Sequence, residues 1–158
     1  MTPANATETT EPASKQSLRL WLKLLKLQRS IEAHIRDKLR REFNTTLPRF
    51  DLMSALHRHP DGLKMSELSH QLMVSNGNVT GITNRLVEEG FVRRINVPGD
   101  RRASRVQLTA EGEHRFLRQA AAHERWVHDA LGSLSLQDSA LLITQLQPSH
   151  EPDSKHTL

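Results

Sequence analysis

The chain has 158 residues but no cysteine, little aromatic content and no long apolar run. Without cysteine it has no disulfide bond, thiolate metal site, cysteine nucleophile or thiol redox sensor. No stretch approaches the roughly 18 apolar residues of a membrane-spanning helix. The first residues also lack the basic start and apolar core of a signal peptide. We therefore expect a cytoplasmic protein that makes no membrane contact.

The sequence also lacks the motifs of common enzymes and metal sites. It contains no G-x-S-x-G, P-loop or G-x-G-x-x-G, so we expect no catalysis and no cofactor. Among its nine histidines, His57 and His59 are two apart and would diverge by about 200° on a helix. The segment that starts at His123 has Val127 where a zinc-protease motif needs its second histidine. We predict no metal site, and a metal-responsive regulator stays open as an alternative.

The apolar residues, 36% of the chain, follow a helical period over a long first segment. Apolar positions recur three or four residues apart at Leu20, Leu24, Leu27, Ile31, Ile35, Leu39 and Phe43. A helix of this length exceeds what a small core needs, and the chain has little else to cover it. One interpretation is a wide core face, and the one we favour is packing against the helix of a partner chain.

The middle of the chain reads as short helices followed by a hairpin. Helices are predicted at 48–59, at 65–72 with Ser66 as N-cap, and at 76–89 with Ser75 or Asn76 as N-cap and an end at Gly90. The runs 91–97 and 104–108 read as strands joined by a charged turn. Two further helices follow, capped by Thr109 and Ser135. This order is typical of a winged helix-turn-helix.

The predicted fold class is mainly α with a small β-hairpin wing, in which a helical dimerisation region accompanies the winged helix-turn-helix. We divide the chain into five parts by composition and periodicity. These are a disordered tail at 1–15, a long helix at 16–47 that we expect to pack against a partner chain, a winged helix-turn-helix domain at 48–109, C-terminal helices at 110–147 and a flexible tail at 148–158.

The predicted helix 76–89 has an outer face with almost no large apolar side chain. Amides, hydroxyls and one guanidinium on that face suit base edges and phosphates in a major groove. We predict DNA contacts for Ser75, Asn76, Asn78, Thr80, Thr83, Asn84 and Arg85. Gly77 and Gly81 share the face, and each costs the helix about 0.5–1 kcal/mol relative to alanine. We interpret them as positions where the backbone lies close to the groove wall; an ordinary solvated face is the alternative.

The predicted hairpin concentrates positive charge. Between residues 91 and 106 there are five arginines against a single acidic residue, Asp100. Arg101 and Arg102 fall at the tip, where arginine fits the negative potential of a narrow minor groove. We predict that both contact DNA and that Asp100 pairs with a nearby arginine and orients it. A solvated basic loop is the alternative.

The segment "VTGITNRLVEEGFVRRINVPGDRRASRVQLTAEG" resembles the core of the MarR family of bacterial winged-helix regulators. The matching positions are Val79-Thr80, Arg85-Leu86, Gly90, Arg94, Asp100-Arg101-Arg102 and Leu108-Thr109-x-x-Gly112. The order of helices around these motifs extends the resemblance over about residues 16–147. Where many members carry arginine or lysine after the Val-Thr pair, this chain has Gly81, which removes one contact expected from the family.

The resemblance implies a homodimer formed by the N- and C-terminal helices. It also implies binding to double-stranded DNA at pseudo-palindromic operators, repression, and release by a small-molecule effector bound between the dimerisation and DNA-binding parts. By the same resemblance, Arg102 would be the minor-groove arginine and Asp100 its positioning partner. A winged helix used only for protein contacts is a further alternative, which would expose apolar side chains on the helix and the wing.

For the effector, "SNGNVTG" followed by "GDRRASRV" is similar to members that respond to an aromatic carboxylic acid or its CoA thioester, an aromatic acyl-CoA. We predict an effector pocket between the first, second and fifth helices, with ordinary core packing as the alternative for most of its residues. The candidates are Trp21, Leu25, Arg29, Phe50, Met53, His123 and Trp126. Arg29, with Lys23 and Lys26, would meet CoA phosphates, and a solvated helix face explains these three equally well.

Overall fold

The computed structural model describes residues 12–97 and 99–147, with the backbone alone at 100–103. It contains six helices and three strands within these ranges: α1 Ala13–Phe43, α2 Leu47–His57, β1 Leu63–Lys64, α3 Met65–Leu72, α4 Asn76–Glu88, β2 Val92–Val97, β3 Asp100–Leu108, α5 Ala110–Ala130 and α6 Leu136–Gln145. This order confirms the predicted fold class of helices with a small wing.

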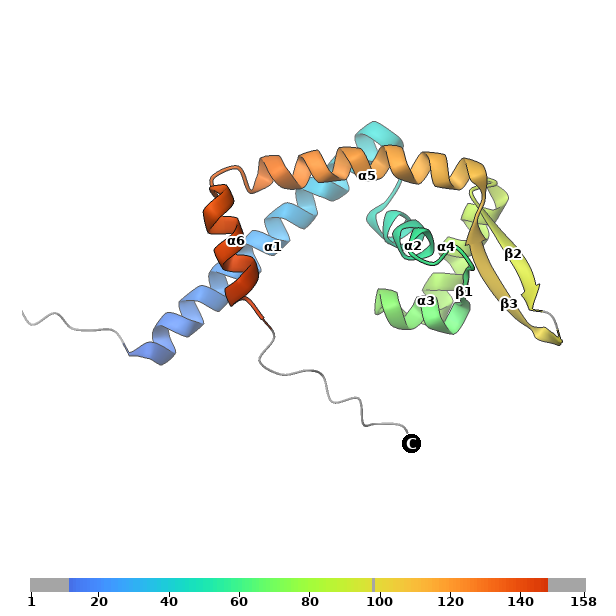
Figure 1. Cartoon of the computed structure of the whole chain (residues 1–158), viewed down its shortest axis with the longest axis horizontal. Coiled ribbons are helices and arrows are strands. Elements are labelled where there is room, and N and C mark those ends of the chain that lie inside the picture. The colour runs from blue at the N-terminus through green and yellow to red at the C-terminus, as the bar shows by residue number, and fades with distance from the viewer. Residues whose placement is uncertain (1–11, 98, 148–158) are drawn as a thin grey trace, which may run out of the picture.

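The elements form a lobe attached to a frame of long helices (Figure 1). Helices α2, α3 and α4 and the three strands make the lobe, and α5 leads away from the hairpin to α6. Helix α1, about 46 Å long by its 31 residues, crosses α5 near the lobe. At that crossing the ring of Phe43 meets the edge of the Trp126 ring, with centroids 6.1 Å apart.

The sheet has one strand more than the predicted hairpin. Its order is β1-β3-β2, all antiparallel, and Leu63 of β1 lies opposite Val106 of β3. Strand β1 has only two residues, too few to show the alternation by which a strand is recognised in a sequence. The turn is also shorter than expected, because β3 already begins at Asp100, which pairs with Val97 after a register shift.

The hydrophobic core lies in the lobe and at its junction with the long helices. Helix α2 contributes Phe50, Leu52, Met53, Ala55 and Leu56, all buried. On α5 the buried face differs from the predicted one. Apolar spacing in the sequence predicts a face through Phe116, Ala120, His123 and Val127, of which only Phe116 is buried and the other three are partly buried. The buried residues of α5 are Gly112, Phe116, Gln119, Ala122 and Trp126.

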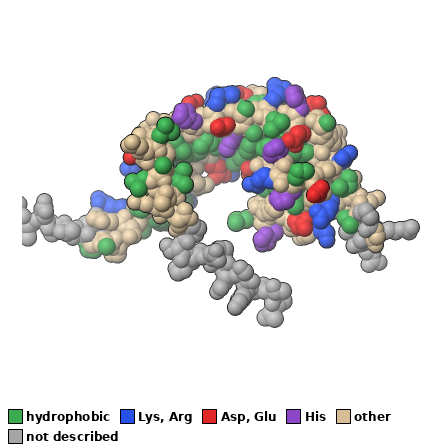
Figure 2. All heavy atoms as spheres, in the orientation of Figure 1, with side chains coloured by type: hydrophobic (Ala, Val, Ile, Leu, Met, Phe, Trp, Pro, Cys, Tyr) green, Lys and Arg blue, Asp and Glu red, His purple; other side chains and the backbone are tan. Residues whose placement is uncertain are grey.

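The first half of α1 and the whole of α6 leave large apolar side chains uncovered. Of the long predicted stripe only Ile35 and Leu39 are buried. Leu20 and Trp21 are 52% and 58% exposed, and α6 has no buried residue. Figure 2 shows hydrophobic side chains on the surface of α6. The described part of the chain therefore leaves both faces exposed.

Helix boundaries agree with most of the predicted caps. The hydroxyls of Ser75, Thr109 and Ser135 accept backbone N–H groups at the starts of α4, α5 and α6. The prediction of Ser66 as a cap was wrong: Lys64 is the N-cap of α3, and its N–H donates to Glu67. Helix α1 begins at Ala13, so residues 13–15 of the predicted tail are helical, while the tail at 148–158 lies outside the described residues.

Candidate nucleic-acid interface

Local interactions set both ends of α4. At its start the Ser75 hydroxyl accepts the N–H of Asn78 at 3.4 Å. At its end Gly90 adopts φ 79°, a left-handed conformation that favours glycine, and its N–H donates to the carbonyl of Val87. The chain therefore turns sharply after α4 and continues into β2, so that α4 lies beside the hairpin (Figure 1).

The outer face of α4 is exposed and polar, as predicted. The exposed residues from its N-cap to its last residue are Ser75, Asn76, Gly77, Asn78, Thr80, Gly81, Asn84, Arg85 and Glu88. Thr80 also donates its hydroxyl to the carbonyl of Asn76 at 2.8 Å, which orients that side chain along the helix. Hydrogen-bonding groups on the remaining side chains are available to a partner.

Thr83 does not belong to this face. It is fully buried, although it was predicted to contact DNA. The helical spacing of three and four residues places it in one stripe with Val79 and Leu86, which are also buried. Its position in the core corrects the prediction for this residue.

The two glycines of α4 stand in open space. A Cβ atom added at Gly77 or Gly81 would meet no atom within 4 Å. Gly77 is the second residue of α4, near its end, whereas Gly81 lies in the interior of the helix. A low helix propensity therefore matters more for stability at Gly81 than at Gly77. Packing inside the protein therefore does not require a glycine at position 81.

Gly81→Ala is expected to raise the free energy of unfolding by about 0.5–1 kcal/mol, because alanine is the better helix former and the site has room. If α4 lies against a groove wall, the added methyl should also weaken DNA binding several-fold. Urea denaturation and fluorescence anisotropy with a bound DNA fragment measure the two effects. Stabilisation without any loss of DNA affinity would show that the glycine is only tolerated.

The three described arginines of the hairpin are held by protein acceptors. Arg94 donates to the side-chain carbonyl of Asn84 at 2.8 Å, which links β2 to α4. Arg93 donates twice to Gln107 of the paired strand, at 3.0 and 2.7 Å, and Arg105 donates to the Gly62 carbonyl at 2.7 Å. The predicted base reader Asn84 thus keeps its amide N–H₂ for a partner while its oxygen positions Arg94.

The tip of the wing carries the remaining predicted contacts. The backbone of Asp100, Arg101 and Arg102 belongs to β3, while their side chains lie outside the described part of the chain. Their roles at the minor groove, and the pairing of Asp100 with an arginine, stay predictions.

The residues predicted to form the effector pocket do not lie around one pocket within a single chain of the structure. Phe50, Met53 and Trp126 are buried in the core, and His123 stacks on Phe50 with ring centroids 4.9 Å apart. Burial lowers the pKa of His123 below its ordinary value of 6.5. The other predicted residues, Trp21, Leu25 and Arg29, lie on the first half of α1. Trp21 stands about 33 Å along the helix axis from Phe43, which contacts Trp126.

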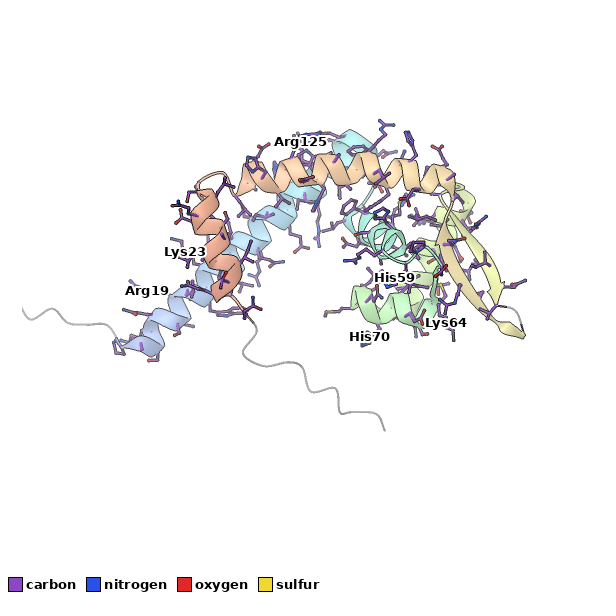
Figure 3. The ribbon with its side chains drawn as sticks, viewed as in Figure 1. Arg19, Lys23, His59, Lys64, His70 and Arg125 are labelled. Carbon is purple, nitrogen blue, oxygen red and sulfur yellow. The ribbon has the colours of Figure 1, made fainter. Side chains whose placement is uncertain are left out.

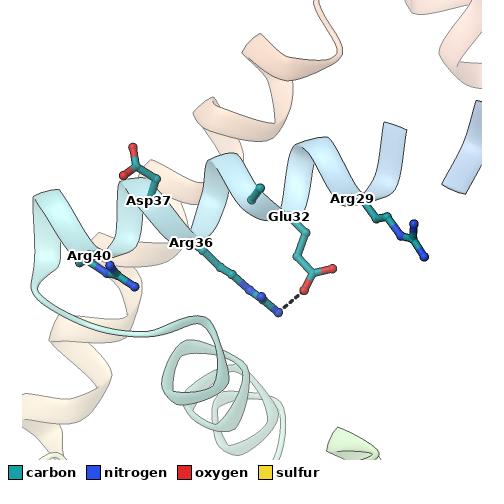
Figure 4. A pocket seen from close by; sticks show the side chains of 6 residues that line it. Arg29, Glu32, Arg36, Asp37 and Arg40 are labelled. Carbon is teal, nitrogen blue, oxygen red and sulfur yellow. Dashed lines mark hydrogen bonds and ion pairs between the residues drawn. The ribbon is translucent and has the colours of Figure 1, made fainter. Parts of the chain in front are cut away.

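A different cleft opens between α1, the start of α2 and the start of α4. One cavity of 460 Å³ is lined by Arg36, Arg40, Thr45, Thr46, Leu47, Pro48, Val74, Asn78 and Ile82. The α1 side of this region carries several arginines, among which Arg36 is paired with Glu32 (Figure 4). Sequence reasoning missed this cleft because its walls come from segments about 40 residues apart, and only Asn78 had been assigned a role.

Next to that cavity Asp51 is partly buried. Burial and the nearby carboxylate of Glu32 raise its pKa above the ordinary value of 3.8, and Arg36 opposes the shift. This side of the cleft therefore disfavours additional negative charge.

Two further kinds of site concern the described residues: clusters of metal-ligating side chains and apolar helices of membrane length. Figure 3 shows His59, Lys64 and His70 at one end of the lobe, and nowhere in the described ranges do three His, Asp or Glu side chains gather as metal ligands. Among the helices of these ranges none is long and apolar enough to cross a bilayer.

Comparison with known proteins places this winged helix-turn-helix in a family. Residues 45–104 match the model of the MarR family. A MarR family transcriptional regulator from Silicibacter pomeroyi has a similar crystal structure, with 33% identity, a TM-score of 0.70, and coverage of 87% of this chain and 94% of that one. The chain belongs to the MarR family, to which that transcriptional regulator also belongs, and this confirms the resemblance seen in its motifs.

Two further similarities bear on the fold. HTH-type transcriptional regulator PecS of Dickeya dadantii is 30% identical over 108 residues, which are 67% of this chain and 65% of PecS. The chain thus spans slightly less than two thirds of the length of that curated relative. Sco3205, a MarR family regulator from Streptomyces coelicolor solved in complex with DNA, shares the fold at 24% identity and a TM-score of 0.69, covering 90% of this chain and 94% of Sco3205.

Proposed function

We propose that the chain acts as a homodimeric, sequence-specific DNA-binding transcriptional regulator in which α4 enters the major groove. The observation that carries this proposal is the outer face of α4. From Ser75 to Arg85 its exposed side chains are amides, hydroxyls and one guanidinium, and the exposed carboxylate of Glu88 follows at the last residue of the helix. Arg94 is held beside this face by Asn84. Such groups read base edges and phosphates. The fold of Sco3205, which was solved with DNA, supports the same use of this architecture.

A winged helix that contacts only proteins would expose apolar side chains on α4 and on the wing. Within the described residues the large exposed hydrophobic side chains lie on α1, α5 and α6 and at Met73, in the turn before α4. Helix α4 and the described part of the hairpin contribute none of them. This distribution favours DNA over a protein partner at α4.

Dimer formation accounts for the apolar side chains that the chain leaves uncovered. They concentrate at two places: Leu18, Leu20, Trp21, Leu22 and Leu27 on α1, and Leu136, Leu141, Ile143 and Leu146 on α6. A symmetric partner that brings the same helices would bury both sets, because an isologous interface uses the same surface twice. Two copies of α4 would then suit a pseudo-palindromic operator with half-sites about 34–36 Å apart.

Repression with release by a small-molecule effector, such as an aromatic carboxylic acid or its CoA thioester, completes the proposal. Its support is the membership of the MarR family together with the motifs around α4 and the wing. An effector that binds the free dimer more tightly than the DNA-bound one shifts the equilibrium away from the operator.

Selection of bound fragments from genomic DNA, followed by fluorescence anisotropy on an enriched fragment, tests DNA binding. Arg85→Ala should weaken binding several-fold and reduce the salt dependence, because an exposed cation on α4 is lost. Arg118→Ala is the matched control, since it removes the same charge from an exposed position of α5. The absence of any enriched fragment, or equal losses in both variants, would contradict the proposal.

A further inference from the structure

Arg94 leaves the hairpin on a different face from the other two described arginines. Successive residues of a strand point to opposite faces of the sheet, so Arg94 shares its face with Val92, two residues before it. Val92 is buried, and so is Val106, which lies directly opposite Arg94 on β3. Arg93 and its cross-strand partner Gln107 belong to the other face. The strand register therefore directs Arg94 toward the lobe, where α4 lies.

The Arg94 side chain ends on Asn84, an exposed residue in the second half of α4. Its guanidinium donates to Oδ1 of Asn84 at 2.8 Å. A guanidinium has donors only, so the end of the amide that faces it must be the carbonyl oxygen and not the N–H₂ group. The bond therefore assigns different uses to the two ends of the amide. The oxygen is engaged within the protein, and the two N–H donors are left for a partner.

The neighbouring positions on the outer face of α4 leave this amide accessible. Gly81, one turn earlier, has no side chain, and even a Cβ atom there would meet no atom within 4 Å. The hydroxyl of Thr80 donates to the Asn76 carbonyl at 2.8 Å, so its hydrogen is already used within the helix. Neither neighbour therefore competes with Asn84 for an acceptor on a base.

The donors and acceptors of an amide decide which base it fits in a major groove. An asparagine with both ends free binds adenine through two hydrogen bonds, because it accepts from N6 and donates to N7. An asparagine whose oxygen is engaged has only donors to offer. Guanine presents two acceptors in the groove, N7 and O6, whereas the N6 amino group of adenine would face a second donor. The bond to Arg94 therefore favours guanine over adenine.

We propose that Arg94 is a positioning residue that holds Asn84 as a reader with donors only, so that Asn84 selects guanine over adenine at one base pair of each half-site. This inference rests on the proposed function and names a base that the proposed function leaves open. Arg94 acts here through the Asn84 oxygen and not through a contact with the base. Its positive charge also attracts phosphates whatever the sequence, so a test must separate base preference from overall affinity.

Selection of bound DNA from a random-sequence pool, carried out with the full chain, tests the inference. Asn84→Ala identifies the base pair that Asn84 reads, because the preference should disappear there alone. At that position the unsubstituted protein should prefer guanine over adenine about tenfold or more, the size of a good side-chain contact to a base. In Arg94→Leu the amide oxygen is free, and the preference should disappear or change to adenine. Anisotropy on two duplexes that differ only at this base pair measures the ratio.

Further variants separate the positioning of Asn84 from the charge of Arg94. Arg93→Leu removes the same charge from the adjacent residue, whose guanidinium is bound to Gln107, so it should weaken binding to all sequences and keep the guanine preference. Asn84→Asp keeps an oxygen for Arg94 but loses both donors, so its preference should move to cytosine, whose amino group donates. Arg94→Lys retains a charged donor and should restore part of the guanine preference.

Thermal denaturation shows whether each variant is folded. A guanine preference that is unchanged in Arg94→Leu, or lost equally in Arg93→Leu, overturns the inference. So does a preference for adenine in the unsubstituted protein at the position that Asn84 reads. If Arg94→Leu is destabilised and binds every sequence more weakly with the same base preference, the bond is only structural and the inference is wrong. If the unsubstituted protein enriches no sequence, the proposed function fails as well, whereas an enriched sequence whose base preference ignores Arg94 refutes the inference alone.

Discussion

Gly112→Ala is expected to destabilise the chain by about 3 kcal/mol or more, because the added methyl has no space. Gly112 is buried in the first turn of α5, where a Cβ atom would lie 1.9 Å from the carbonyl oxygen of Phe91 and 2.8 Å from its carbon. Both atoms belong to the backbone, so no rotamer change relieves the contact. Helix propensity alone predicts the opposite sign, since alanine is the better helix former.

The clash would act at the joint between the wing and α5. There the N–H of Thr109 donates to the carbonyl of Phe91 at 3.1 Å, and the Thr109 hydroxyl donates to the carbonyl of Gly90 at 2.7 Å. Moving Phe91 away from Gly112 would strain both bonds. A loss of about 3 kcal/mol is a large fraction of the roughly 5–15 kcal/mol that stabilises a typical domain.

Urea denaturation followed by circular dichroism measures this effect. Gly81→Ala is the matched control, because the same substitution there meets open space within a helix and should stabilise the protein. An unfolding midpoint for Gly112→Ala equal to or above that of the unsubstituted protein would show that α5 can move away from Phe91 without a loss of stability. The contact also gives a physical reason for the glycine of the Leu-Thr-x-x-Gly motif.

The helices were predictable because their apolar periodicity and caps are local. The start of α5 could be read from Thr109, and the end of α4 from Gly90. The buried faces were less predictable where polar residues lie in the core. Thr83 and Gln119 are fully buried, and in the described part of the chain the Thr83 hydroxyl and both polar atoms of the Gln119 amide lack a hydrogen-bond partner. A prediction that assumes an apolar core therefore assigned the wrong buried face to α5 and placed Thr83 on the exposed face of α4.

The candidate interface was predictable for a related reason. The outer face of α4 depends on the periodicity of one helix, so its exposed asparagines and threonine could be assigned from spacing alone. The bond between Arg94 and Asn84 depends on how β2 lies beside α4, and the cleft between α1 and the starts of α2 and α4 depends on three separate segments. Spacing within one segment carries no information on either. It also carries none on the distance between Trp21 and Phe50, which were predicted to line one pocket.

The double substitution Leu20→Glu and Leu27→Glu is expected to leave the chain monomeric and to abolish specific DNA binding. The two positions are seven residues apart and share one face of α1, where they are 52% and 41% exposed. In the proposed dimer this face is covered by the partner, and burying two unpaired carboxylates there would cost more than the interface gains. A monomer would then bind only one half-site of the operator and would lose the added affinity that comes from binding both half-sites together.

Light scattering coupled to size-exclusion chromatography measures the oligomeric state, and anisotropy measures DNA affinity. Arg118→Glu is the control, since it changes the net charge by the same amount at an exposed position of α5. The core residues Ile35 and Leu39 lie farther along the helix, so the lobe should keep its fold in both variants. A double variant that stays dimeric and binds DNA as before would place the dimer interface elsewhere and leave the exposed leucines of α1 without a role in assembly.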